Sequence, residues 1–531
     1  MAESTSSKSS SLVCSLMQKA FPINRSEYGK FFPMAGLIFM TIFSFTMLRN
    51  SKDVLLLSAP GVSENSLPYA KFFLVFPVSI AFSMCYIKIK NLFDFEKTYY
   101  IILSAFISFY ALFNCVLYPL SGYLHPSVTT IQYLQTLAPP LHNFIALFGV
   151  WTFALYYIAS ELWGTYSLSV LFWQFANDTI STEESKRYYS LLIMVGNLAL
   201  MGLSYVLDLL SAHFKGDMLI YAVNTVVISS GLVMLVLFRY INRSVLTNPV
   251  YRSNSRAPKK KKAKMSLTDS VKELSQSRYV MYIALIVLSY GILINLFETV
   301  WKGQIKLFFT VDGVTDKNGM QSFMSRYTFY TGFFTILLTY VKIIMSKMSW
   351  RTAASITPIA CGGCGLIFLT YCMNASTLNL SLAALGVINA GYFAIAFGAA
   401  GVIFSKSSKY AFFDPTKEMA YIPLSSSLKA SGKAAVDGVG ARLGKSGGGM
   451  LQIILQLMVC LVTGSPVTTS LPLLPYFFVI IGTLAVIWTY SVYQLSVEYE
   501  HKIAGLAQEN DPTEKPSPDT EGKDKAAPVT G

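Results

Sequence analysis

The feature that most constrains this chain is a series of apolar runs, most of them 18 or more residues long, which recur along most of its 531 residues. At ~1.5 Å per residue, a helix of that length crosses a hydrocarbon layer of ~30 Å. A bilayer interior contains no water to satisfy exposed backbone groups, and nothing in the pattern suggests a closed barrel, so each run is predicted to be a helix. The runs lie near residues 32–48 (continued at 54–57), 68–87, 98–119, 142–175, 188–211, 217–239, 279–300, 321–346, 352–373, 379–404, 433–463 and 470–493. We therefore predict an all-α membrane protein with about twelve transmembrane helices.

Composition supports this class and argues against several others. Hydrophobic residues make up 53% of the chain and charged residues 13%, whereas an ordinary globular domain carries about a quarter charged residues. The net charge of +14 first reflects lysine and arginine in cytoplasmic loops, so we expect no nucleic-acid partner. Cys361 and Cys364 have CxxC spacing, but they lie inside a predicted helix with no second pair or nearby histidine. Close packing of small residues therefore explains them better than zinc, and we expect no metal and no cofactor.

A basic segment over residues 256–264 separates six apolar runs from six more. Such a segment by itself fits a nucleic-acid patch, a membrane-surface clamp or a solvated linker. The loops near 120–141, 374–378 and 464–471 contain no lysine or arginine, whereas the intervening segments contain many. By the positive-inside rule, both termini are then expected in the cytoplasm. The stretch 302–320, where Lys306 and Lys317 face Asp312 and Asp316, is expected to be a partly ordered outer loop.

Two sets of six helices joined by a long cytoplasmic linker are typical of the major facilitator architecture, whose halves enclose a site near the bilayer midplane. Lys52 and Lys302 lie at similar offsets within the first helix of each set, and both should therefore face one central cavity. We predict a major-facilitator-like fold with two six-helix halves. Its parts are a cytoplasmic segment over 1–30, a half over 31–240, a basic linker over 241–275, a half over 276–495 and a disordered cytoplasmic tail over 496–531.

Charged residues inside the predicted spans indicate where function lies, because each costs roughly 2.5 to 3.5 kcal/mol at membrane depth unless it has a partner, water or a role. Glu161 lies between long apolar stretches, which favours a functional role over an interfacial position. For Glu298 and Lys302 an ordinary i,i+4 salt bridge at a helix end is the alternative. The candidate binding residues are Arg49, Lys52, Asp53, Glu161, Glu298, Lys302, Lys417, Lys433 and Lys445.

Lysines that converge from several helices suit a polyanion, because each ammonium offers a point charge to phosphate oxygens in a site of reduced dielectric. The carboxylates would balance these lysines in the empty site or carry a proton. The predicted substrate therefore contains phosphate.

The glycine-rich segment 444–449 does not fit a nucleotide-hydrolysing loop. Only three residues separate Gly440 from Gly444, where a Walker A motif needs four. The glycines serve either close helix packing or the approach of backbone N–H groups to phosphate. The four histidines are dispersed without ligand spacing, so we expect no catalytic residues and no enzymatic activity.

Several further segments form a recognisable pattern. They are Leu48-Arg49-Asn50-Ser51-Lys52-Asp53, Ser160-Glu161-Leu162-Trp163-Gly164, Leu171-Phe172-Trp173-Gln174-Phe175-Ala176-Asn177, residues 298–302, residues 413–424, Gly432-Lys433-Ala434-Ala435 and Gly444-Lys445-Ser446-Gly447-Gly448. Together they resemble the nucleotide transporter family, which contains the ATP/ADP translocases of obligate intracellular bacteria and plastids. The resemblance covers nearly the whole chain, and residues 414–424 are its most specific part. Asn50 and Gln174 stand where the family usually has aspartate and glycine.

The resemblance implies a twelve-helix exchanger that imports host nucleotides, commonly ATP for ADP. The family's functional charges match Lys52, Glu161 and Glu298, while its late lysine remains open among Lys417, Lys433 and Lys445. We therefore expect a monomeric antiporter in the lipid bilayer of the bacterial inner membrane, which exchanges ATP for ADP or related nucleotides by alternating access. The alternatives are a proton-coupled nucleoside triphosphate symporter and a broader ribonucleotide or NAD exchanger.

Overall fold

The computed structural model describes residues 23–248, 251, 277–344, 348–384, 389–424, 432, 436 and 440–509. These residues are almost entirely helical. One short hairpin joins β1 (Thr310–Val311) to the antiparallel β2 (Val314–Thr315). Its turn residues Asp312 and Gly313 have φ of 49° and 78°, as the type I′ turn of a tight hairpin requires.

The first half contains the elements up to η6. They are η1 (Arg25–Glu27), α2 (Tyr28–Leu57), α3 (Ser66–Tyr69), η2 (Ala70–Val75), α4 (Phe76–Leu92), α5 (Phe95–Leu112), η3 (Phe113–Leu117), α6 (Ser121–Leu124), α7 (Val128–Leu137), η4 (Pro139–Leu141), α8 (His142–Gly149), α9 (Trp151–Trp163), η5 (Gly164–Phe172), α10 (Trp173–Thr179), α11 (Thr182–His213), α12 (Asp217–Tyr240) and η6 (Ile241–Val245). As the sequence predicts, the charges of the first span lie inside one unbroken helix, α2.

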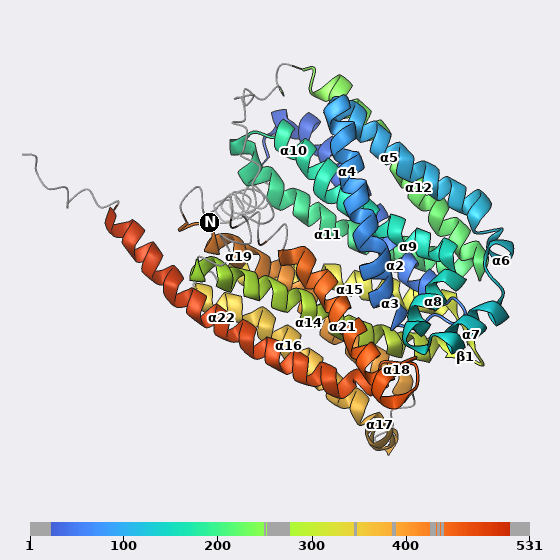
Figure 1. Ribbon diagram of the computed structural model, residues 1–531. Coiled ribbons are helices and arrows are strands. Elements are labelled where there is room, and N and C mark those ends of the chain that lie inside the picture. The colour runs from blue at the N-terminus through green and yellow to red at the C-terminus, as the bar shows by residue number, and fades with distance from the viewer. Residues whose placement is uncertain are drawn as a thin grey trace, which may run out of the picture.

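The second half contains the elements from α14 onward. They are α14 (Arg278–Phe309), α15 (Lys317–Ile344), α16 (Trp350–Met373), α17 (Ala375–Ala384), α18 (Ala390–Ser408), η8 (Lys409–Phe413), α19 (Asp414–Ala420), α21 (Ala441–Thr463), η10 (Leu471–Leu473) and α22 (Leu474–Glu509), besides the hairpin. In Figure 1 most of the helices up to α12 occupy the upper part of the view, and those from α14 onward occupy most of the lower part.

Ten described helices are long and apolar enough to cross a membrane, and residues 139–149 with 151–179 form an eleventh candidate, bent by 82°. In addition, α15 has 28 residues, which at ~1.5 Å each also exceed the thickness of a bilayer core. It is less apolar than its neighbours, and Ser325, Thr328, Thr331 and Thr335 on it are buried. The prediction of an all-α membrane protein with about twelve spans is confirmed.

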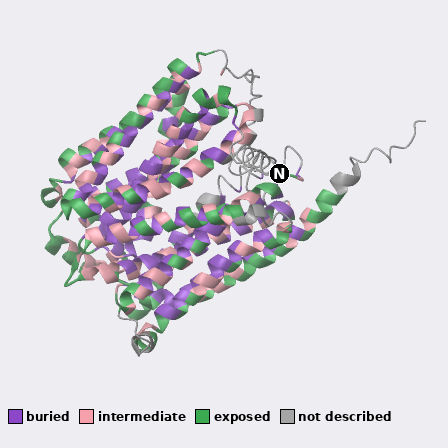
Figure 2. Cartoon of the chain, turned by 180° about the vertical axis from the view of Figure 1, so that it is seen from behind, coloured by how far each residue is buried: buried purple, intermediate pink, exposed green. Residues whose placement is uncertain are grey.

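Two hydrophobic cores correspond to the two halves. One contains only residues between 23 and 251. The other is built mainly from residues 279–495 and also takes in residues 54–75 and 144–157 of the first half. Figure 2 shows this buried material running through the middle of the molecule, with exposed residues on the outer faces of the helices. The halves therefore pack separately and share apolar contacts around the C-terminal end of α2.

Helices α11 and α15 form a polar seam between the halves. Ser204 and Ser325 each donate a hydroxyl hydrogen bond to the other's backbone carbonyl, at 2.7 and 2.8 Å. One turn further on, Ser322 donates to Asp208 at 3.1 Å. A Cβ at Gly332 would lie 3.1 Å from the Asn197 carbonyl oxygen, so the missing side chain allows the close approach. Small residues with polar contacts are the usual means of joining helices in a membrane.

The end of the molecule away from residues 23 and 509 is closed by polar contacts between the halves. The Asn143 amide donates to Gln456 at 3.0 Å and to the Val467 carbonyl at 2.9 Å. The Glu64 carboxylate accepts bonds from both the backbone N–H and the hydroxyl of Ser470, at 2.8 and 2.9 Å. Lys306 donates to the Val62 carbonyl. We call this group of contacts the sealed end.

At the opposite end, the described ion pairs each join residues of one half. Lys30 contacts Glu184 at 2.7 Å and Arg187 contacts Glu27 at 2.6 Å, all within the first half. Lys409 contacts Asp414 at 2.6 Å within the second half. Among the described residues, the ion pairs at this end therefore do not join the two halves, in contrast to the polar contacts of the sealed end.

Three expectations about individual spans differ from the structure. Residues 379–404 are not one span, since a new helix begins at Ala390 and the helical run extends to Ala420. Residues 302–309 belong to α14 instead of a loop, and Lys317 pairs with Asp217 at 2.8 Å rather than with a neighbouring aspartate. The span predicted over 142–175 breaks between α8 and α9. Only in the second case do side chains that the sequence placed in a loop, such as Lys306 and Lys317, make contacts from helices.

Candidate functional site

Helix α2 carries charged side chains where it is most enclosed. Lys52 and Asp53 each have 4% of their side chains exposed, whereas Arg49 has 39%. The helix continues through them because residues 54–57 are apolar and fully buried in the core. An uncompensated ion buried in this way costs several kcal/mol, so these side chains need oppositely charged partners.

Asp53 connects lysines from both halves. One carboxylate oxygen accepts from Lys52 at 2.9 Å, and the other accepts from Lys302 on α14 at 2.7 Å. Lys52 also lies 3.0 Å from Glu161 on α9 and 3.7 Å from the centroid of the Tyr157 ring, where the ring face attracts a cation. The Asp53–Lys302 contact therefore joins α2 to α14, and thus one half to the other.

Glu298 is the acidic centre on the second half. Its carboxylate contacts Lys406 on α18, and it lies 3.8 Å from Lys302 and 3.9 Å from Arg49. Lys406, with 8% of its side chain exposed, also donates to the Tyr327 hydroxyl at 2.7 Å. Because Lys302 lies closer to Asp53, Glu298 and Lys302 are members of a larger network and not an isolated pair at a helix end.

The two halves use equivalent helices with opposite charges. In the first half, Lys52 on the first membrane helix contacts Glu161 on the fourth. In the second half, Glu298 on the first helix contacts Lys406 on the fourth. Parallel repeats are expected to place equivalent positions around one central axis. The result is a buried network of alternating charge that spans both halves, which we call the ion-pair network.

Two of these charged residues precede a π-helical segment by three positions. The π-helix η5 begins at Gly164, after Glu161, and η8 begins at Lys409, after Lys406. π-helical turns are rare and occur often at functional sites. The fourth helix of each half therefore changes its winding directly beside the ion-pair network.

Lys71 lies near the network but is held differently. It is part of the π-helix η2, and its ammonium donates to the Asn295 amide oxygen at 2.6 Å. Asn295 precedes Glu298 by three positions on α14 and so lies on the same face of that helix. Lys71 is thus a fifth basic group at the site, beside Arg49, Lys52, Lys302 and Lys406.

The two departures from the expected family pattern lie in different places. The Asn50 amide donates to the Thr328 hydroxyl at 2.8 Å, which adds an uncharged link between α2 and α15. Gln174 accepts from the Tyr86 hydroxyl at 3.2 Å and from Lys90 at 3.5 Å. The oxygen of Gln174 is therefore occupied by contacts with α4.

The candidate late lysines are not part of this network in the described residues. Lys417 pairs with its neighbour Glu418 at 3.6 Å in α19. Lys433 lies outside the described residues, and so does the side chain of Lys445. The choice among these three lysines stays a prediction.

The glycines of residues 444–449 lie at helix contacts. A Cβ at Gly444 would lie 3.3 Å from the Gly291 Cα atom, and one at Gly448 would lie 3.2 Å from the Asn295 Cβ atom. A Cβ at Gly449 would come within 3.5 Å of the Pro68 carbonyl oxygen. This geometry supports close packing of α21 on α14 and α3 as the role of the motif.

Comparison with known proteins identifies the family. A model of the TLC ATP/ADP transporter family matches residues 6–499. The chain belongs to this family. It is 34% identical over 506 residues to ADP,ATP carrier protein 1 of Rickettsia typhi, a match that covers 93% of this chain and 98% of the relative. It is 35% identical over 489 residues to ADP,ATP carrier protein 1 of Chlamydia pneumoniae, covering 90% of this chain and 92% of the relative.

Solved structures show the same fold at low sequence identity. A bacterial homologue of the iron transporter ferroportin in an inward-facing state aligns with a TM-score of 0.50 at 12% identity, covering 87% of this chain and 98% of that one. A D-xylose-proton symporter aligns with a TM-score of 0.50 at 13% identity, covering 87% and 97%. These likenesses support the major-facilitator-like architecture alone.

Sequence reasoning missed two basic residues at the site of this TLC family member. Lys406 was counted among cytoplasmic lysines because the tenth span was placed to end at residue 404. The apolar residues 411–413 that follow Lys406 are the signal that the helix continues, as residues 54–57 are for α2. Lys71 lies within the second predicted span, 68–87, but it is not among the candidate binding residues, and the contact with Asn295 reveals its position.

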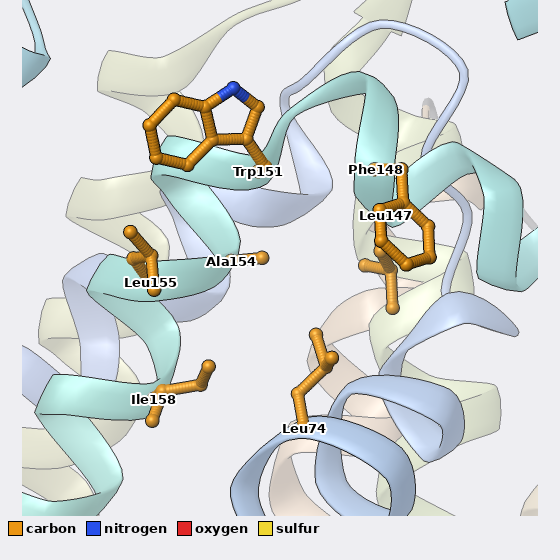
Figure 3. A pocket seen from close by; sticks show the side chains of 7 residues that line it. All are labelled: Leu74, Leu147, Phe148, Trp151, Ala154, Leu155 and Ile158. Atoms are coloured by element: carbon orange, nitrogen blue, oxygen red, sulfur yellow. The ribbon is translucent and has the colours of Figure 1, made fainter. Parts of the chain in front are cut away.

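An apolar pocket of this TLC family member lies apart from the charged groups of the network. It is lined by seven side chains of α8, α9 and η2, and Figure 3 shows them around the space at the break between α8 and α9. They are Leu74, Leu147, Phe148, Trp151, Ala154, Leu155 and Ile158. The lining contains no charged group, so it does not offer the chemistry that phosphate binding requires.

Proposed function

We propose that this chain exchanges ATP for ADP across the bacterial cell membrane, as a nucleotide transporter of the TLC family. The observation that carries the proposal is the ion-pair network, in which Asp53 joins a lysine of each half at 2.9 and 2.7 Å. A polyanion binding between the halves meets lysines from both of them. Binding is thereby linked to the relative position of the halves, as alternating access requires.

When the site is empty, the carboxylates of the network neutralise the lysines, as the phosphates of a bound nucleotide would. Lys52 is shared by Asp53 and Glu161 at 2.9 and 3.0 Å, and Glu298 is shared by three basic groups. Incoming phosphate oxygens replace some of these contacts, so the lysines exchange one anionic partner for another. Since each carboxylate already has a basic partner, the arrangement favours exchange against a second nucleotide over proton carriage.

The exposed edge of the network gives nucleotides access. Glu161 and Arg49 have 37% and 39% of their side chains exposed, whereas Asp53 and Lys302 have 4% and 8%. Apart from Lys306, the sealed end lies on or beside segments that lack lysine and arginine, such as the loop near 464–471, which the positive-inside rule assigns to the outside. In our proposal both termini are cytoplasmic, the described conformation is open to the cytoplasm, and the protein acts as a monomer in the bilayer without enzymatic activity.

Proteoliposomes with defined internal contents test the function. We expect uptake of labelled ATP to require internal ADP or ATP, and Lys52→Ala and Glu161→Gln to abolish it, because each removes a partner of the central ion pairs. Lys259→Ala, in the basic linker, is the control and should transport like the wild type.

Uptake into vesicles without internal nucleotide, accelerated by external acid, would contradict exchange and favour proton symport. Competition by other ribonucleotides or NAD as strong as competition by ADP would contradict ATP/ADP specificity. Wild-type uptake by Lys52→Ala or Glu161→Gln would remove the network from the transport site.

A further inference from the structure

We propose that Lys71 is a phosphate-binding residue of the transport site, an inference that rests on the proposed nucleotide exchange. Lys71 comes from η2 (Ala70–Val75), the π-helical turn at the start of the second membrane helix. The residue is of intermediate exposure, so part of it is open to solvent. Its position therefore permits contact with a ligand that enters the network from the open side.

The partner of Lys71 is what distinguishes it from the other basic groups. Arg49, Lys52, Lys302 and Lys406 each have a carboxylate within 4.0 Å. Among the described residues, no ion pair includes Lys71, and its hydrogen bond goes to the neutral amide oxygen of Asn295 at 2.6 Å. A phosphate that reaches Lys71 replaces an amide contact with a charge-assisted bond, and no carboxylate has to be displaced.

Lys71 is also placed to act together with the network. Asn295, Glu298 and Lys302 lie at positions i, i+3 and i+7 on one face of α14. A polyphosphate chain several ångströms long can therefore bridge Lys302 and Lys71 along this face.

The surrounding packing fixes Lys71 in this place. Gly448 of α21 leaves room for Asn295, since a Cβ there would lie 3.2 Å from the Asn295 amide nitrogen. A Cβ at Gly449 would lie at an ordinary contact distance of 3.5 Å from the carbonyl oxygen of Pro68, three positions before Lys71. Helix α21 therefore lies against both α14 and the segment that leads into η2, where Lys71 and Asn295 meet.

Three variants of the full-length protein, assayed for ATP/ADP exchange in proteoliposomes, test the inference. In Lys71→Gln the positive charge is lost, and we expect the KM for ATP and for ADP to rise on the order of tenfold, the range of a charge-assisted hydrogen bond. Lys71→Arg keeps the charge and should stay close to the wild type. In Asn295→Asp the new carboxylate pairs with Lys71 and competes with phosphate, so KM should rise while the melting temperature does not fall.

The matched control is Lys90→Gln, which should leave KM unchanged. Lys90 lies on the same membrane helix as Lys71, but its ammonium donates to Gln174. A purely structural Lys71 predicts the reverse pattern, with a lower melting temperature in Lys71→Gln and an unchanged KM in Asn295→Asp. Wild-type exchange combined with an unchanged KM in both Lys71→Gln and Asn295→Asp would overturn this inference and leave the proposed function intact. Absence of exchange by the wild-type protein would overturn the proposed function itself.

Discussion

At the level of single residues, Asp53 is the carboxylate that connects the two halves. It is buried, and its two oxygens hold lysines of different halves. Removing one partner of a buried ion pair leaves the other charge uncompensated, which costs about 3–5 kcal/mol. The same uncompensated lysines would attract any anion that can take the place of the carboxylate.

We therefore expect Asp53→Asn to lower the melting temperature of the detergent-solubilised protein and to raise the stabilisation that ATP confers on it. The phosphate charge would replace the missing carboxylate, so the ATP-induced shift in melting temperature should exceed that of the wild type. Exchange should fall, because the link between the halves is lost. An ATP-induced shift no larger than that of the wild type would contradict this role, and Asp414→Asn, which alters an ion pair within the second half, serves as the control.

Sequence reasoning went furthest where the chemistry of one residue conflicts with its surroundings. Lys52, Glu161 and Glu298 interrupt long apolar runs, and their cost in a membrane makes them visible without a structure. The pairing through Asp53 was not predictable, because neighbouring positions on a helix point in different directions and the partner Lys302 is 249 positions away. Prediction from sequence is least accurate at the ends of spans, as Lys406 shows. The predicted span ends at residue 404, two residues too early to include this lysine, which is buried in the structure.

At the level of elements, the packing of α21 against α14 depends on glycine at particular positions. A Cβ at Gly448 would lie 3.2 Å from Asn295 and 3.3 Å from the Ile292 Cα atom, whereas one at Gly447 would meet nothing within 4 Å. The two glycines are adjacent on one helix, yet only one of them faces a neighbour. They form a matched pair for separating packing from backbone effects.

We expect Gly448→Val to destabilise the protein by about 1–3 kcal/mol, the usual cost of overpacking, and to reduce exchange by displacing Asn295. Gly447→Val has the same change in helix propensity without the clash, and it should be close to neutral in thermal unfolding. Equal effects of the two substitutions would contradict the packing role and would favour a role of the backbone N–H groups.

At the level of the whole molecule, the sealed end sets the balance between the two open conformations. Its polar contacts join the halves directly, as in the bonds from Asn143 to Gln456 and to the Val467 carbonyl. Each bond contributes about 1 kcal/mol, and all of them must break before the site opens on that side. Weakening them should shift the population towards the opposite conformation.

We expect Asn143→Ala to increase labelling of a cysteine placed at Ser51, inside the molecule, by an impermeant maleimide added outside the cell. A loss of one to two kcal/mol corresponds to about a five- to thirtyfold change in population. Asn374→Ala is the control, since Asn374, the residue that caps the end of α16, donates to the Thr370 carbonyl of that helix and not to the other half. Labelling of the native cysteines is subtracted with the protein that lacks the added one, and an unchanged rate would show that Asn143 does not hold the end closed.

The polar character of α15 has a consequence for biosynthesis. Its buried threonines donate to carbonyls of α15 itself, and Thr328 also accepts a bond from Asn50 of α2. Ser325, in contrast, is satisfied by α11, in the reciprocal bonds with Ser204. When α15 leaves the ribosome, lipid offers no substitute for these partners. We therefore expect α15 to insert more readily when the first half is already in the membrane to receive Ser325, so the order in which the two halves are translated favours insertion.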